Sequence, residues 1–193
     1  MRYLCIHKFV NMAEARKTNR RTPARSRVNV PQEDAYGHLQ PQAVEFEEAV
    51  LGALMIEQDA FSIISEILKP ECFYDHRHQV VYAAIRGLNS QQKPVDILTV
   101  TEYLRSMGKL EEVGGPFYIA QLSDKVSSSA HIEYHARIIA QKFLARELIT
   151  FTSTVQTKAF DGTVDVDDLM QEAEGKLFEI SQQNMKKDYT QIN

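Results

Sequence analysis

The side chains of this sequence that could bind a metal ion form two groups. Cys72, His76 and His78 lie close together, and His131 and His135 are one helical turn apart. A zinc site needs three or four ligands at matched spacings. No cysteine or aspartate lies close to the second pair, so the pattern favours histidines at helix starts, half-buried or on the surface, over a metal site.

The sequence was also searched for carboxylates that could act as a general acid and base, and for a phosphate-binding loop. A cluster of glutamates comprises Glu45, Glu47, Glu48 and Glu57. A general acid–base pair needs a desolvated, concave pocket, whereas these residues fit the solvated side of one helix. A Walker loop ends in Gly-Lys-Ser/Thr, but Gly108-Lys109 and Gly175-Lys176 are both followed by leucine. We therefore predict no catalytic, cofactor-binding or metal-binding residue in this chain.

Composition narrows the class of protein. The 193 residues are 44% hydrophobic and 25% charged, which is typical of a globular chain of about one domain plus flanks. No stretch approaches the ~20 apolar residues of a transmembrane helix. The two cysteines, Cys5 and Cys72, are far apart, so we expect no disulfide framework and a cytoplasmic location.

The net charge of −4 averages two unlike parts. Residues 1–40 hold eight basic and three acidic residues, a net +5, and the remainder is −9. Residues 11–38 have almost no apolar periodicity, which predicts that residues 1–39 form a disordered basic arm. Such an arm can bind nucleic acid, so a nucleic-acid-binding module is one alternative function. A solvated tail is favoured, because no aromatic residues are interleaved with the basic ones.

Helical periodicity with short polar breaks runs from residue 40 to residue 128. It predicts a helix over about 43–57, a short helix that Asp59 begins and Pro70 ends, helices capped by Asp75 and Asp96, and one with Pro116 at its first position. Asn89 is expected to cap the third helix in a left-handed conformation, and Met107 to point inward. These elements predict a small orthogonal helical bundle.

A longer pattern follows over residues 129–183. No glycine or proline interrupts residues 130–160, so one helix could span about 46 Å. Asp161-Gly162 breaks it, and Asp165 is positioned to cap a last helix. The predicted fold is therefore all-α: a small orthogonal bundle followed by a long antiparallel helical hairpin.

The apolar stripe of this hairpin needs a partner surface, and a second copy of the chain is the simplest one. The alternative is a hairpin that folds back along its own bundle. The predicted self-association residues are Phe143, Leu144, Leu148, Phe151, Val155, Leu169 and Leu177.

Seven short strings carry a family resemblance, in register over about residues 40–183. They are PQAVEFEEAVLG (41–52), LKPECFY (68–74), HRHQVVYAAI (76–85), PVDILTV (94–100), GKLEEVGG (108–115), YIAQL (118–122) and HARII (135–139). Each string alone is weak, but their order and spacing are specific. Together they resemble the N-terminal domain of bacterial replicative DNA helicases, the DnaB family.

This resemblance implies a collar and docking domain. In the family, hairpins pair and build a threefold collar on a hexamer, and the collar recruits primase and, in some bacteria, helicase loaders. The parent would be an ATP-dependent DNA helicase, with ATP, magnesium and DNA handled by a RecA-like motor domain. We expect residues 184–193 to begin the linker to that domain. This chain would then have no activity or cofactor of its own, and little or no DNA binding.

Residues 1–39 have no identifiable counterpart in the family. The main alternative function is the helicase-binding domain of primase, which resembles a similar bundle plus hairpin. Val113-Gly114-Gly115 and its flanks favour the helicase. A free-standing enzyme has no supporting residues.

Overall fold

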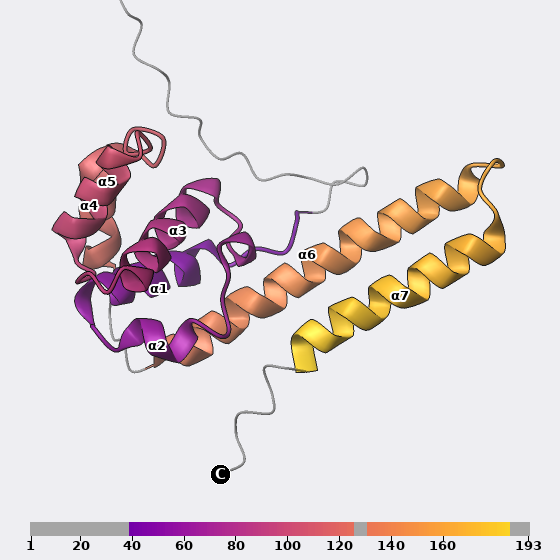
Figure 1. Ribbon diagram of the computed structural model, residues 1–193, viewed down its shortest axis with the longest axis horizontal. Helices are drawn as coiled ribbons and strands as arrows, with labels where there is room; N and C mark the ends of the chain where they lie inside the picture. The colour runs from indigo at the N-terminus through magenta and orange to yellow at the C-terminus, as the bar shows by residue number, and fades with distance from the viewer. Residues whose placement is uncertain (1–38, 126–130, 186–193) are drawn as a thin grey trace, which may run out of the picture.

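The computed structural model describes residues 39–125 and 131–185, and all regular structure in these ranges is helical (Figure 1). The elements are α1 (Val44–Ile56), α2 (Ala60–Ile64), the short 3-10 helix η1 (Pro70–Cys72), α3 (His76–Ser90), α4 (Ile97–Ser106), α5 (Gly115–Asp124), α6 (Ile132–Phe160) and α7 (Val166–Met185). The predicted all-α fold is confirmed. The predicted arm and most of the predicted linker lie outside the described residues.

Helix α1 is the centre of the bundle, and it packs against α3, α5 and the first half of α6. Its residues from Val50 to Met55 are all buried. Around it lie the largest buried side chains of the bundle, including Phe73, Tyr82 and Ile85. Burial of each large apolar side chain stabilises the fold by about 1.5–3 kcal/mol, so this core holds the surrounding helices in place.

Aspartates begin three of the helices, as the sequence predicts. The carboxylate of Asp75 accepts a hydrogen bond from the Arg77 N–H at 2.8 Å, and that of Asp96 accepts from the Thr99 N–H at 2.8 Å. Asp165 likewise accepts from the Asp167 N–H at 2.9 Å. Each bond satisfies a backbone donor that has no partner within its helix. Asp59 precedes α2 without such a bond.

Three local predictions are wrong. Asn89 lies inside α3, and Gln92 is the residue with a left-handed φ of 54°. There the Lys93 N–H bonds to the Leu88 carbonyl, closing the helix end three residues later than expected. Pro70 begins η1 instead of ending α2. Met107 lies just beyond α4 and is 46% exposed, because the chain turns at Gly108, where φ is +69°.

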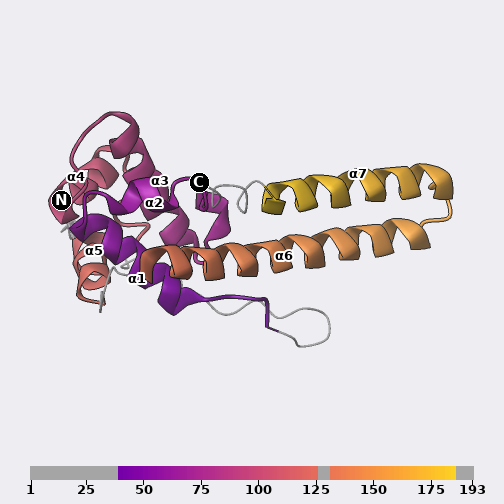
Figure 2. The same ribbon diagram turned by 90° about the horizontal axis from the view of Figure 1, so that it is seen from below.

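The predicted hairpin consists of α6 and α7, joined near Asp161. The first half of α6 buries Ile132, Ala136 and Ile139 against the bundle. The second half projects away from the bundle, and α7 runs antiparallel along it (Figure 2). The hairpin therefore does not fold back along its own bundle. No described helix is long and apolar enough to cross a membrane.

Candidate functional site

The structure divides the seven predicted self-association residues into separate groups. Phe143 packs against the bundle core, and Leu144 is half-buried. Phe151, Val155 and Leu169 line a groove between α6 and α7. Leu148 and Leu177 are 36% and 48% exposed. The structure thus brings three of the seven together within one chain and leaves two on the surface, and their role in self-association stays a prediction.

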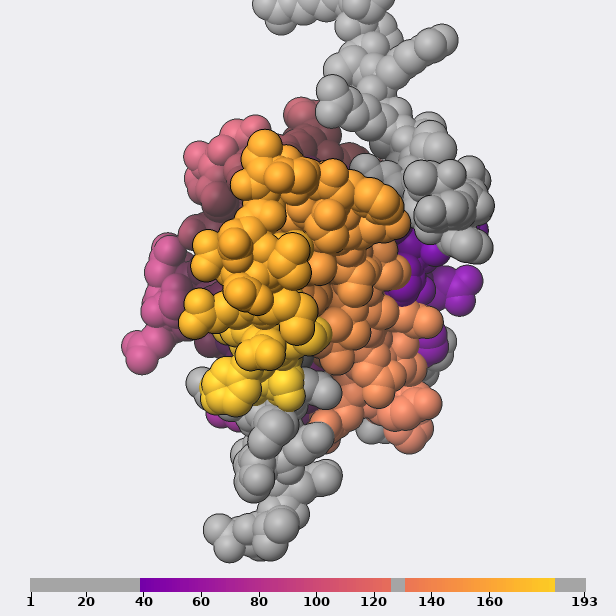
Figure 3. Space-filling model, turned by 90° about the vertical axis from the view of Figure 1, so that its right-hand side faces the viewer, coloured from indigo at the N-terminus to yellow at the C-terminus, as the bar shows by residue number. Residues whose placement is uncertain are grey.

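Further apolar side chains are exposed on the hairpin, which forms the near face of the molecule in Figure 3. Val166 and Met170 are 71% and 57% exposed, and with Leu177 they follow a helical spacing along one side of α7. Ile149, Phe160 and Phe178 are also exposed. The sequence prediction omitted Met170 and Phe178, although Met170 continues the spacing that starts at Val166. Several large apolar side chains exposed on one hairpin are a feature of interaction surfaces.

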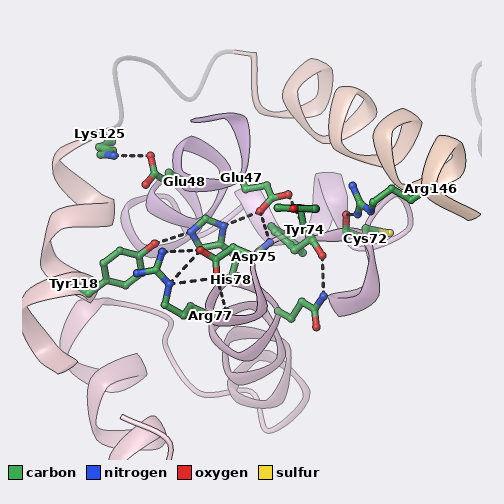
Figure 4. A network of polar contacts seen from close by, with 12 residues as sticks. Glu47, Glu48, Cys72, Tyr74, Asp75, Arg77, His78, Tyr118, Lys125 and Arg146 are labelled. Carbon is green, nitrogen blue, oxygen red and sulfur yellow. Dashed lines mark hydrogen bonds and ion pairs between the residues drawn. The ribbon is translucent and has the colours of Figure 1, made fainter. Parts of the chain in front are cut away.

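A second cluster lies inside the bundle, where polar side chains from α1, α3 and α5 meet (Figure 4). The carboxylate of Glu47 is 1% exposed. It accepts hydrogen bonds from the Tyr74 N–H at 2.7 Å and the Asp75 N–H at 3.3 Å, and it lies 2.7 Å from Nδ1 of His78. Nε2 of His78 is 2.7 Å from the Tyr118 hydroxyl. We call Glu47, His78 and Tyr118 the buried triad.

Proton positions in the buried triad follow from its partners. A carboxylate that accepts two backbone N–H groups is itself only an acceptor, which assigns the Nδ1 proton to His78. In the neutral ring, Nε2 then accepts from the Tyr118 hydroxyl. Both ring nitrogens are therefore engaged within the fold. The arrangement fixes α1, α3 and α5 to one another and offers no free group for reaction with a substrate.

Arg77 covers the outer side of the buried triad. Its guanidinium forms a two-pronged ion pair with Asp75, with Nη2 at 2.6 Å from Oδ2 and Nε at 3.1 Å. The guanidinium also lies 4.4 Å from the centroid of the Tyr118 ring. Burial alone would raise the pKa of Asp75, but hydrogen bonds from the Arg77 side chain and backbone hold it below the usual value. Asp75 therefore stays ionised and paired with Arg77, and the Arg77 guanidinium is held against the Tyr118 ring.

Burial raises the pKa of Tyr118 to about 12. A phenol with a raised pKa stabilises the fold below its unfolded pKa of about 10, and this contribution is lost as the pH rises towards 12. We therefore expect a Tyr118→Phe variant to lose less stability than wild type between pH 10 and 12. Urea unfolding at several pH values in this window measures the effect. If the free energy of unfolding changes equally with pH in both proteins, the raised pKa of Tyr118 does not contribute to stability.

Two sequence predictions for this region are wrong. Glu47 is buried instead of solvated, and His78 is completely buried, while His76 remains exposed and pairs with Glu112 at 2.8 Å.

In the parts of the chain that the structure describes, no group of three or more His, Cys, Asp or Glu residues could hold a metal ion. His135 instead packs edge-on against Phe46, at 5.1 Å between ring centroids.

Arg146 fastens the base of the hairpin to the bundle, a role that the sequence did not reveal. One nitrogen of its guanidinium donates to the Pro41 carbonyl at 2.8 Å, and another to the Cys72 carbonyl at 2.7 Å. The guanidinium also lies 5.6 Å from the Tyr74 ring centroid. Arg146 thereby ties α6 both to η1 and to the segment that enters α1.

Comparisons with known proteins agree on one family. The model described as "DnaB-like helicase N terminal domain" matches residues 39–141, more than half of the chain. The replicative DNA helicase DnaB of Rhodothermus marinus is 45% identical over 157 residues, 81% of this chain and 17% of that protein. The replicative DNA helicase DnaC of Bacillus subtilis is 39% identical over 144 residues, 75% of this chain and 32% of that protein. The chain thus spans about a third or less of these relatives.

Two solved structures have the same fold. The N-terminal domain of DnaB helicase from Mycobacterium tuberculosis superposes with a TM-score of 0.68 at 31% identity, covering 72% of this chain and 98% of that one. A second is described as the structure of a DnaB-like replicative helicase and its interactions with primase. It superposes with a TM-score of 0.60 at 25% identity, covering 72% of this chain and 31% of that one.

Proposed function

This chain belongs to the family of DnaB-like helicase N-terminal domains, and on that premise we propose that it is the collar and protein-docking domain of its helicase. In this role it organises the hexameric ring and recruits primase during DNA replication, and it has no catalytic activity of its own. The observation that carries the proposal is the projecting hairpin, whose apolar side chains at Leu148, Val166, Met170 and Leu177 remain exposed.

The motor activity belongs, in this proposal, to a further RecA-like domain that uses ATP and magnesium. The relatives are several times longer than the region they share with this chain, which leaves room for such a domain. Residues 184–193 would lead towards it, and DNA would be held by the full ring. We propose a cytoplasmic location, because replication takes place there in bacteria.

Primase is the proposed partner, and helicase loaders are a second candidate. The description of one solved relative names interactions with primase, which supports the same partner here. The alternative function, the helicase-binding domain of primase, is not favoured, because the relatives described above are replicative helicases.

Light scattering after size-exclusion chromatography tests the self-association. We expect the 22.1 kDa wild-type chain to form dimers or larger assemblies as its concentration rises. Replacing both Leu148 and Leu177 with aspartate should weaken assembly at least about tenfold, because each buried leucine contributes about 1.5–3 kcal/mol. The matched control is Leu98→Asp, at a leucine of α4 that is 79% exposed.

Two outcomes contradict this proposal. A wild-type chain that stays monomeric at every concentration shows that the domain does not self-associate. Equal weakening by Leu98→Asp shows that the hairpin is not the surface involved. Recruitment is measured separately, by surface plasmon resonance with purified primase from the same organism over the immobilised chain, and the absence of binding at high primase concentration would rule it out.

A further inference from the structure

Helix α7 and the turn before it carry a concentration of negative charge. Residues 161–185 include seven acidic residues and a single lysine. Within the described ranges, ion pairs involve Glu172 with Lys158 and Glu179 with Lys176. Asp167, Asp168 and Glu174 are exposed and have no ion pair with any described residue. The hairpin thus has a negatively charged face that the bundle does not cover.

The geometry of α7 separates this face from the packed one. Leu169 and Ile180 are buried towards α6. Asp167 and Glu174 are seven residues apart, so they project from the same side of α7, and their angular positions place that side away from α6. Asp168 projects about 100° further round the helix than Asp167, on the flank of that side. We call Asp167 and Glu174, with Asp168 on their flank, the acidic face of α7.

A segment of opposite charge occurs in the same chain. Residues 16–27 hold six basic residues and no acidic one: Arg16, Lys17, Arg20, Arg21, Arg25 and Arg27. This basic segment lies outside the described residues. Its charge of +6 equals the net −6 of residues 161–185, from seven acidic residues and one lysine.

The segment that precedes α1 is anchored at Pro41, beside the base of the hairpin. Arg146 holds the Pro41 carbonyl at 2.8 Å, so the chain that leads back to the basic segment starts at the base of the hairpin. Arg27 is 14 residues from Pro41, and 14 residues can span at most about 46–50 Å. The helix from Arg146 to Phe160 covers only about 21 Å, so the acidic face of α7 is within reach.

We propose that the basic segment, residues 16–27, binds the acidic face of α7 on its own chain. Exposed ion pairs are individually weak, but a short tether converts binding into an intramolecular event at a high effective concentration. Nucleic acid is the less favoured occupant for the segment, because residues 41–193 carry a net charge of −9 and repel a polyanion. The contact extends beyond the collar function, which depends on the apolar side of the hairpin.

Carbodiimide cross-linking of the full chain tests this contact directly. The reagent condenses a lysine amine with a carboxylate to an amide, and is itself converted to a urea by taking up the water. Lys17 is the one lysine in the basic segment. We expect mass spectrometry to identify amides from Lys17 to Asp167, Asp168 or Glu174, and their loss at 500 mM salt, where the screening length falls to a few ångströms. An equal mixture of light and ¹⁵N-labelled chains separates links within one chain from links between chains.

Charge reversal supplies the matched variants. Asp167→Lys with Glu174→Lys should abolish the cross-links to α7. Glu66→Lys with Glu111→Lys changes the net charge equally at exposed positions of the bundle, and should leave the links intact. Limited trypsin digestion is the second measurement, since cleavage after Arg20 and Arg21 should be slower in wild type than in the α7 variant.

Several results would overturn the proposal. Links from Lys17 that spread over the bundle, or a trypsin rate that the α7 variant does not change, show that the face is not the binding site. Links only between light and heavy chains make a second copy the occupant. A single-stranded oligonucleotide that binds wild type but not Arg20→Glu/Arg21→Glu, without links to α7, assigns the segment to nucleic acid.

Discussion

Replacing Glu47 with alanine should lower the free energy of unfolding by about 3–5 kcal/mol, because each buried donor that loses its acceptor costs about 1–3 kcal/mol. The substitution leaves the Tyr74 and Asp75 N–H groups and Nδ1 of His78 without their acceptor, in a site that is 1% exposed. Buried donors without partners carry the full cost of desolvation. Urea unfolding followed by circular dichroism gives the free energy.

The neighbouring chain offers a matched control for this variant. Glu45 is on the same helix two residues earlier and is exposed, so Glu45→Ala should change stability by less than about 0.5 kcal/mol. A cycle of Glu47→Ala, His78→Ala and the double variant measures the coupling within the buried triad. Equal effects of Glu45→Ala and Glu47→Ala would show that the triad does not stabilise the bundle.

Arg146→Ala should cost about 2–4 kcal/mol, because it removes two charge-assisted hydrogen bonds and leaves the Pro41 and Cys72 carbonyls without that donor. Arg146→Lys should lie between wild type and alanine, since one ammonium group cannot reproduce the planar fork of the guanidinium. Hydrogen exchange should accelerate around η1 and at the start of α1.

Arg105→Ala is the control for this second prediction. Arg105 pairs with Glu102 on the surface of α4, with its side chain 57% exposed, and such pairs contribute little. If Arg146→Ala is no more destabilising than Arg105→Ala, the base of the hairpin is held by apolar packing alone.

Much of the fold could be predicted from the sequence because its determinants are local. Helical periodicity, the Asp75, Asp96 and Asp165 caps and the Asp161-Gly162 break involve residues only a few positions apart. The buried triad joins residues 31 and 40 positions apart, so its partners were not visible in any window.

The burial of Glu47 and His78 could, however, have been predicted from their spacing to apolar residues. Glu47 precedes Val50, Leu51 and Leu54 by three, four and seven residues, which is the spacing of one helix face. His78 precedes Val81, Tyr82 and Ile85 by the same intervals. Both polar residues therefore stood on the core face, and residue type alone led to the wrong interpretation.

The apolar stripe of the hairpin was predicted, but not what each side chain packs against. Phe143 faces the bundle because α6 belongs to both parts of the fold. Leu169 and Leu177 are eight residues apart, which turns them about 80° from each other on α7. One therefore packs on α6 while the other stays exposed. Periodicity reports an apolar surface without saying which partner covers it.

Helix α6 makes the hairpin a lever. It runs from Ile132 in the bundle to Phe160 at the tip as one helix, and it contains no glycine or proline at which to bend. About 21 Å of it extends beyond Arg146, so a tilt of about 5° at the base moves the tip by about 2 Å. A force on the tip of the hairpin therefore acts on the contact between α6 and the bundle. At that contact Arg146 forms hydrogen bonds to the Pro41 and Cys72 carbonyls.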